Sequence, residues 1–289
     1  ITADGTGTEL RYSTGVRNRG HYSAHLRPQS FSLSIPNDWD WKGRSALNFN
    51  SQYSYLQLLG SAFLRRAGLT APESRQIKLR LNGVDPTGGS TTAASYNFYV
   101  CNEFQDKAFA DHHFPTDGNG NIYSVRRTDS GPYQEGDFTY LTPEGRNGGD
   151  PYRRVYTKNT NASEDNWSDL IAMTEAMAKG QFTTLLATPT WAADYVTAVR
   201  AKVDVDQWMT WLAAQAIIGN GESSLINGYG DDFYLYFGIT DPRARLTPYD
   251  MDTILGDGDE PVSATDDIFR MIRHNSDNYP ALTPTPLYP

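Results

Sequence analysis

The chain of 289 residues lacks several features that would place it in a familiar class. It has one cysteine, Cys101, which excludes an internal disulfide framework. No apolar run approaches the length of about 18 residues that a membrane helix needs, so no membrane span is predicted. Lysine and arginine are not clustered and the net charge is −9, which argues against nucleic acid or an anionic membrane surface as a partner.

Glycine, proline and tyrosine are abundant instead, with 25, 16 and 18 residues, a composition that predicts many turns and is typical of exported proteins. The length is sufficient for one large domain or for two closely packed halves. The chain begins with Ile1 and ends in an extended, proline-rich stretch over 284–289. We therefore expect it to be a trimmed piece of a longer exported protein, extracellular or at the cell surface.

The first part of the chain, 1–128, is expected to be rich in strands. Alternating polar and apolar residues predict a strand pair within 9–35 and strands at 75–81 and 95–100. Apolar residues at helical spacing predict a helix over 55–67 that ends at Gly68.

The last part, 163–289, is expected to be mainly helical. Helices are predicted at 163–180, from 188, and at 203–218, followed by a hairpin of strands at 233–237 and 245–249. Between the two parts, 129–162 is polar and rich in Gly, Pro and Tyr, and we interpret it as a surface connection. The fold class predicted from this plan is α+β, with a site between the two parts.

The most informative local pattern follows the second strand of the hairpin. Asp250 and Asp252 stand two residues apart at the end of a short apolar run, and Asp257, Asp259 and Glu260 follow. Such dense carboxylates repel one another unless a cation lies among them, and Mg²⁺ and Ca²⁺ prefer carboxylate oxygens. A metal site is therefore predicted at Asp250 and Asp252, with a solvated acidic turn as the alternative.

A polar loop after the third helix supplies more candidates. It contains Glu222, Asn227, Asp231 and Asp232. Phosphoryl transfer uses one carboxylate to orient the attacking hydroxyl and further oxygen ligands to hold a metal ion. Glu222 is the candidate catalytic carboxylate, and Asn227 and Asp232 are candidate ligands. Their alternatives are a helix cap or exposed polar residue for Glu222, and turn residues for the aspartates.

Several segments, in order, resemble blocks of the CotH family, spore-coat kinase-like proteins remotely related to protein kinases. The first block is G-V-R-N-R-G at 15–20, and the next is L-N-F-N-S-Q-Y at 47–53 with the helix that follows and K-L-R-L-N-G at 78–83. Y-V-C-N-E at 99–103 resembles a strand that ends in a family glutamate. I-G-N at 218–220, F-Y-L-Y at 233–236 and P-Y-D-M-D-T at 248–253 resemble the last blocks.

The resemblance implies one two-lobed, atypical protein-kinase-like domain, with a strand-rich N-terminal lobe and a mainly helical C-terminal lobe. It implies a bacterial, exported enzyme that uses ATP and Mg²⁺ or Mn²⁺, with Ca²⁺ as an alternative ion, to phosphorylate secreted or surface proteins. Carried over by position, Asp250 matches the metal-binding acid, Asp252 its neighbour, and Glu103 the glutamate of the N-terminal lobe.

The chain also departs from the family pattern. Gln29 stands where a phosphate-binding lysine is expected, and Arg27 is the nearest cation. Glu222 stands where the family has its catalytic aspartate, which moves the carboxylate by one methylene; a misplacement of about 1 Å can cost about 100-fold in rate. The rival expectation is therefore a catalytically silent CotH-like module with a structural role in a surface or coat assembly. A D-x-D nucleotide-sugar transferase is a weaker third alternative.

One pair of histidines, His112 and His113, follows the strand that ends at Glu103. Neighbouring residues of a helix project in different directions, so we do not expect the two imidazoles to share a metal ion.

Cys101 lies in an apolar strand and is expected to be buried and inert.

Overall fold

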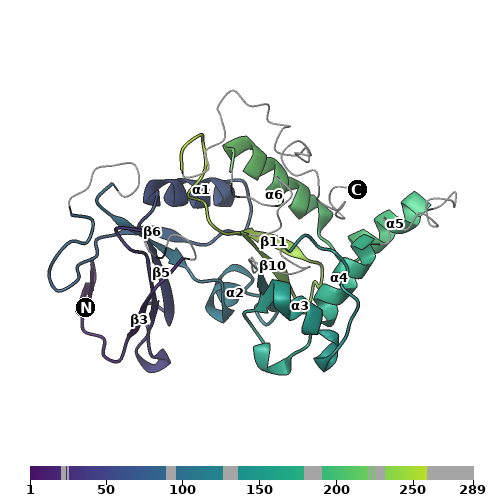
Figure 1. Ribbon diagram of the computed structural model, residues 1–289, viewed down its shortest axis with the longest axis horizontal. Coiled ribbons are helices and arrows are strands. Elements are labelled where there is room, and N and C mark those ends of the chain that lie inside the picture. Colours follow the sequence, from purple (N-terminus) through teal and green to yellow (C-terminus); the bar gives the residue numbers. More distant parts are fainter. Residues whose placement is uncertain are drawn as a thin grey trace.

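The structure is a computed structural model that describes residues 1–20, 24, 26–88, 96–125, 136–178, 191–220, 222, 225 and 232–258 (Figure 1). It contains both helices and antiparallel sheets, so the expected α+β class is confirmed. The candidates Asn227, Asp231, Asp259 and Glu260 lie outside the described residues.

A five-stranded antiparallel sheet forms the first half. Its strands are β3 (Gly15–Asn18), β4 (Phe31–Ser34), β5 (Ala46–Asn50), β6 (Ser74–Ile77) and β7 (Tyr99–Glu103), in the order β3-β4-β5-β7-β6. The register pairs Phe31 with Phe49 and Leu33 with Leu47, so these apolar side chains share one face. They form a separate hydrophobic cluster with Tyr99 and neighbouring residues.

Helix α1 (Ser54–Arg66) lies against the other face of this sheet and contacts β6 and β7. It buries Leu56 and Leu64 in the main core, as its apolar spacing predicted. The helix ends where Gly68 takes a positive φ of 80°, the conformation that glycine adopts most easily.

A four-stranded antiparallel sheet forms the centre of the second half (Figure 1). Its strands are β8 (Asn121–Val125), β9 (Tyr156–Lys158), β10 (Phe233–Phe237) and β11 (Arg245–Pro248), in the order β11-β10-β8-β9. All five residues of β10 are buried, because this strand pairs on both sides and has packed elements on both faces. The predicted hairpin is the pair β10 and β11.

The remaining helices pack mainly around this second sheet. They are α2 (Lys107–His113), α3 (Asp150–Val155), α4 (Ser168–Ala178), α5 (Trp191–Arg200) and α6 (Val205–Ile218). Short elements complete the described residues: β1 (Thr2–Asp4), β2 (Gly7–Glu9), and the 3-10 turns η2 (Asn37–Trp39), η3 (Arg146–Gly148) and η4 (Ala162–Glu164). The main core joins α1, α3, α4 and α6 to the second sheet. Among the described residues, no helix is both long and apolar enough to cross a bilayer.

Two expectations about the middle of the chain are wrong in the structure. Residues 136–162 are not only a surface connection: they contain α3 and β9, and Tyr152, Val155 and Tyr156 are buried in the core. The helix expected from 163 begins at Ser168, because Asp165 has a φ of 51° and interrupts the helical path. Tertiary packing of aromatic residues outweighs the polar composition of this segment.

Candidate functional site

The paired acids lie at the end of the β10–β11 hairpin. Phe233 is paired with Pro248, so Asp232 and Tyr249 are the next residues across the hairpin, and the Tyr249 N–H donates to the Asp232 carbonyl at 3.3 Å. Asp232 and Asp250 both have positive φ, 54° and 36°, a region that non-glycine residues seldom occupy. Such conformations persist where the surrounding structure imposes them, and they are frequent at functional sites.

Glu222 reaches the same place from the end of α6. The helix stops at Gly219, which has a φ of 59°, and is followed by the fully buried Asn220. Asn220 accepts the Glu222 N–H at 3.1 Å and donates to Gln215 at 3.1 Å, so it fixes the loop to the helix. Candidate ligand atoms of Glu222, Asp250 and Asp252 all lie within 4.8 Å of one another.

The ionisation of Glu222 depends on the two aspartates beside it. Burial raises the pKa of Glu222 well above its ordinary value, and the charges of Asp250 and Asp252 raise it further. A hydrogen bond between Glu222 and Asp252 acts in the same direction. In the absence of a cation, Glu222 is therefore protonated near neutral pH and donates to Asp252.

A hard divalent cation fits this donor set. Three carboxyl groups supply the oxygen ligands that Mg²⁺, Mn²⁺ and Ca²⁺ prefer. Asp252 is 9% exposed, so its charge receives little screening from solvent. A cation would take the place of the proton that the acids now share and would remove their mutual repulsion.

Gln57 on α1 completes the surroundings of the acid pair and was not predicted from the sequence. Its Nε2 lies 3.4 Å from Asp250 Oδ1 and 3.4 Å from Asp252 Oδ2. Its Oε1 accepts from the amides of Asn50 and Asn102 in the five-stranded sheet. The sequence does contain a sign of this role, a glutamine within the apolar row of a predicted helix. A buried polar side chain needs hydrogen-bond partners, so such a glutamine points to a polar site nearby.

A cavity of about 380 Å³ lies beside the acids and has walls from both sheets. Its lining includes Asp232, Asp250 and Asp252, together with Arg19, Asn48 and Asn50. Arg19 donates to the Tyr249 hydroxyl. Burial alone would lower the pKa of Arg19, but Tyr249 and Asp250 outweigh it and the pKa is raised, so the charge persists. Arg19 belongs to the segment 15–20 that resembles the CotH family, but no role was predicted for it from the sequence.

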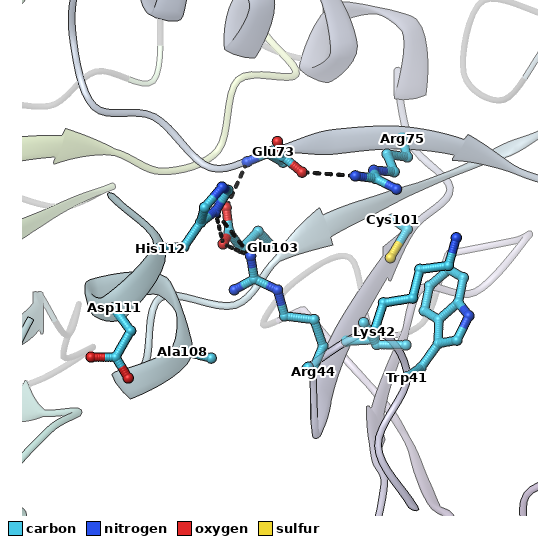
Figure 2. A pocket seen from close by; sticks show the side chains of 12 residues that line it. Trp41, Lys42, Arg44, Glu73, Arg75, Cys101, Glu103, Ala108, Asp111 and His112 are labelled. Atoms are coloured by element: carbon cyan, nitrogen blue, oxygen red, sulfur yellow. Dashed lines mark hydrogen bonds and ion pairs between the residues drawn. The ribbon is translucent and has the colours of Figure 1, made fainter. Parts of the chain in front are cut away.

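The other residues predicted to bind nucleotide are Arg27, Gln29 and Glu103, and Glu103 lines a small pocket of about 40 Å³ together with Arg19 and Asp250. Arg27 Nη1 donates to Gln29 Oε1 at 2.7 Å, and neither residue is among those that line the cavity of about 380 Å³. Glu103 is bound by the guanidinium of Arg44 and also lines a pocket of about 590 Å³ (Figure 2).

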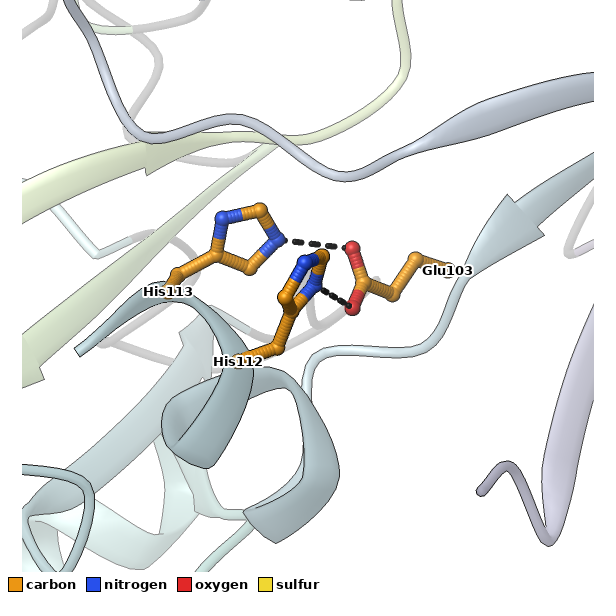
Figure 3. Close-up of side chains that lie close together, drawn as sticks. All are labelled: Glu103, His112 and His113. Atoms are coloured by element: carbon orange, nitrogen blue, oxygen red, sulfur yellow. Dashed lines mark hydrogen bonds and ion pairs between the residues drawn. The ribbon is translucent and has the colours of Figure 1, made fainter. Parts of the chain in front are cut away.

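The two histidines also differ from expectation. His112 Nδ1 lies 3.2 Å from Glu103 Oε1, and His113 Nε2 lies 2.8 Å from Oε2 (Figure 3). The expectation that the imidazoles would face apart is wrong, because Glu103 lies opposite the end of α2 and presents one oxygen to each ring.

Comparison with known protein families identifies a match over most of the sequence. The family model described as CotH kinase protein matches residues 16–283, nearly the whole chain. No curated protein matches the sequence.

Proposed function

This chain belongs to the CotH kinase protein family, and on that premise we propose that it is an exported, ATP-dependent enzyme that phosphorylates hydroxyl groups of secreted or surface proteins. The observation that carries the proposal is the cluster of Glu222, Asp250 and Asp252 beside a cavity that also contains Arg19. Oxygen ligands for a metal and a cation for phosphate are two of the requirements of phosphoryl transfer.

The arrangement of the elements supports a two-lobed, kinase-like interpretation. The five-stranded sheet and α1 would be one lobe, and the four-stranded sheet with α3, α4 and α6 the other. The cavity has walls from both, which is where ligand sites occur most often. Its volume of about 380 Å³ is within the usual range for a small-molecule site.

Asp250 and Asp252 would hold Mg²⁺ or Mn²⁺, with Asp232 beside them. When bound, the ion supplies positive charge to the phosphate oxygens. Arg19, which lines the same cavity, would supply a second positive charge. Glu222, held in place by Asn220, would accept the proton of the acceptor hydroxyl once it has lost its own proton.

Two measurements test the proposal. Calorimetry should detect binding of ATP with Mn²⁺ or Mg²⁺, and labelled ATP should transfer phosphate to a hydroxyl-bearing protein or to the chain itself. Both signals should disappear in Asp250→Asn, which removes a charge with little change of shape. Binding and transfer equal to those of the parent protein would contradict the proposal.

A second candidate is a catalytically silent module with a structural role in a surface or coat assembly. In protein kinases a strand lysine pairs with a helix glutamate. In this chain the strand before α1 and α1 itself supply Asn50 and Gln57 instead of a charged pair. The Asn50 amide donates a hydrogen bond to Gln57 Oε1 at 3.0 Å. Nucleotide binding without any phosphate transfer, or no binding at all, would favour this candidate.

A further inference from the structure

A second group of metal-binding side chains lies where the five-stranded sheet leads into α2. Glu103 is the last residue of β7, and His112 and His113 are the last two residues of α2. Their candidate ligand atoms lie within 4.8 Å of one another, and the Glu103 side chain is only 3% exposed. Figure 3 shows both imidazoles directed toward the two oxygens of this carboxylate.

Hydrogen bonds alone do not satisfy His112 Nδ1. This nitrogen lies 3.1 Å from Arg44 Nη2 and 3.2 Å from Glu103 Oε1. Arginine can only donate and a carboxylate can only accept, whereas a neutral ring nitrogen is either a donor or an acceptor. Whichever tautomer is present, one of the two contacts is unfavourable.

The carboxylate of Glu103 is ionised over the physiological range. Burial alone would raise its pKa, but hydrogen bonds from His113 and from the Glu73 N–H, with the charges of His113 and Arg44, outweigh burial and hold the pKa at about 2. A cation between Glu103 and the imidazoles would accept electron pairs from Nδ1 and from the carboxylate, and it would take the place of Arg44 Nη2, which now contacts both groups.

We propose that Glu103, His112 and His113 form a binding site for a divalent transition metal of the zinc class. Zinc binds imidazole nitrogen and carboxylate oxygen at about 2.0–2.2 Å, which places neighbouring ligands of a tetrahedron about 3.4 Å apart. His112 Nδ1 lies 3.2 Å from Oε1 and His113 Nε2 lies 2.8 Å from Oε2, so the carboxylate would bind through both oxygens or the rings would move toward one of them. Imidazole ligands distinguish this site from the all-carboxylate cluster, which favours Mg²⁺ or Mn²⁺.

The pocket beside these residues leaves room for a further ligand. His112 is 45% exposed at its side chain and lines the pocket of about 590 Å³ with Arg44 and Asp111 (Figure 2). Three protein ligands with a fourth position open to water is a common zinc arrangement. Cys101 also lines this pocket, but burial raises the pKa of its thiol to about 12, and it lies outside the group of three.

A metal ion here would join the two halves of the structure. Glu103 belongs to the five-stranded sheet. Helix α2 packs on the four-stranded sheet through Phe109, and Phe114, the residue after the helix, stacks its ring on Tyr236 at 3.8 Å. Binding to the folded state should therefore raise the thermal unfolding temperature of the chain.

The test is a titration of chelator-treated protein with Zn²⁺, and with Co²⁺ as a spectroscopic probe, in excess Mg²⁺ so that the carboxylate cluster is already saturated. We expect one equivalent of Zn²⁺ to bind and visible Co²⁺ absorption bands of low-coordinate geometry. His112→Ala and His113→Ala should each weaken Zn²⁺ binding by more than about tenfold, the smallest loss usual even for an outer-shell residue.

Two controls make the result specific. The remaining histidines, His21, His25 and His274, lie outside the described residues, and their combined replacement by alanine should leave Zn²⁺ affinity unchanged. Asp250→Asn should also leave it unchanged, which separates this proposal from the proposed phosphotransfer function. His112 is the decisive position, because its side chain is 45% exposed and its replacement by alanine should leave the fold intact. Circular dichroism of His112→Ala checks this. No Zn²⁺ binding, or unchanged binding in His112→Ala, would overturn the proposal.

Discussion

The side-chain amide of Gln57 lies 3.4 Å from Oδ1 of Asp250, although 193 residues separate the two in the sequence. This contact connects α1 to the loop after β11, and the same amide group also receives hydrogen bonds from the five-stranded sheet. The position of the acid pair therefore depends on both halves of the structure.

Replacing Gln57 by leucine should destabilise the protein. The change keeps the approximate volume but leaves the Asn50 and Asn102 amides without their common acceptor, and each stranded buried group costs about 1–3 kcal/mol. Urea unfolding measures the effect. Gln76→Leu on the exposed side of β6 is the matched control and should change stability by less than about 0.5 kcal/mol. Equal stability of the two variants would show that the Gln57 network contributes nothing.

Replacing Asp250 by asparagine should weaken Mn²⁺ binding by more than about tenfold, because the variant loses a charged ligand in a cluster of three. Calorimetric titration in the absence of nucleotide measures it. Asp206→Asn, whose side chain is 83% exposed on α6, removes the same charge far from the cluster and should bind Mn²⁺ normally. Similar losses in both variants would mean that only net charge matters.

Glu222 should make the metal-free protein less stable as the pH rises. Its pKa in the folded state is raised above the ordinary value of 4.5, so above that pH the folded state holds more protons than the unfolded chain. Stability then decreases with increasing pH, and full stability is present only below the unfolded pKa. In chelator, the unfolding temperature should fall from about pH 5 to about pH 8, and less steeply in Glu222→Gln.

Two comparisons check this interpretation. Glu144→Gln alters an exposed glutamate and should follow the parent protein at each pH. Excess Mg²⁺ should reduce the slope in the parent protein, because the ion replaces the proton. A parent slope that matches that of Glu222→Gln in chelator would contradict the assignment.

Arg19, rather than Arg27, should bind nucleotide phosphate. Arg19 lines the cavity with Asp250, whereas Arg27 pairs with Gln29. Loss of a charge-assisted hydrogen bond of about 1.5–3 kcal/mol should lower ATP affinity about 10- to 150-fold in Arg19→Met. Arg27→Met should retain the parent affinity, and calorimetry distinguishes the two. Loss of ATP affinity in Arg27→Met, with parent affinity in Arg19→Met, would instead favour Arg27, the cation nearest to the position indicated by the family resemblance.

Much of the local structure could be predicted from the sequence. The period of two at 31–34, the helical spacing of α1, and the apolar rows of α6 and β10 correspond to elements of the structure. These patterns are local, because a strand or helix that buries one face shows its period in the residues themselves. The ordered blocks also predicted the family, which the match over residues 16–283 confirms.

The sequence by itself thus determined the α+β class, the family and the acidic character of the turn at Asp250 and Asp252. Family resemblance had already indicated Glu222, but only the tertiary structure decided that Gln57 and Arg19, from two distant segments, also meet that turn. It also decided that His112 and His113 face one carboxylate. The physical reason is that helix and strand periods depend on near neighbours, whereas the meeting of charged groups depends on how the sheets and helices pack, and no local pattern records that packing.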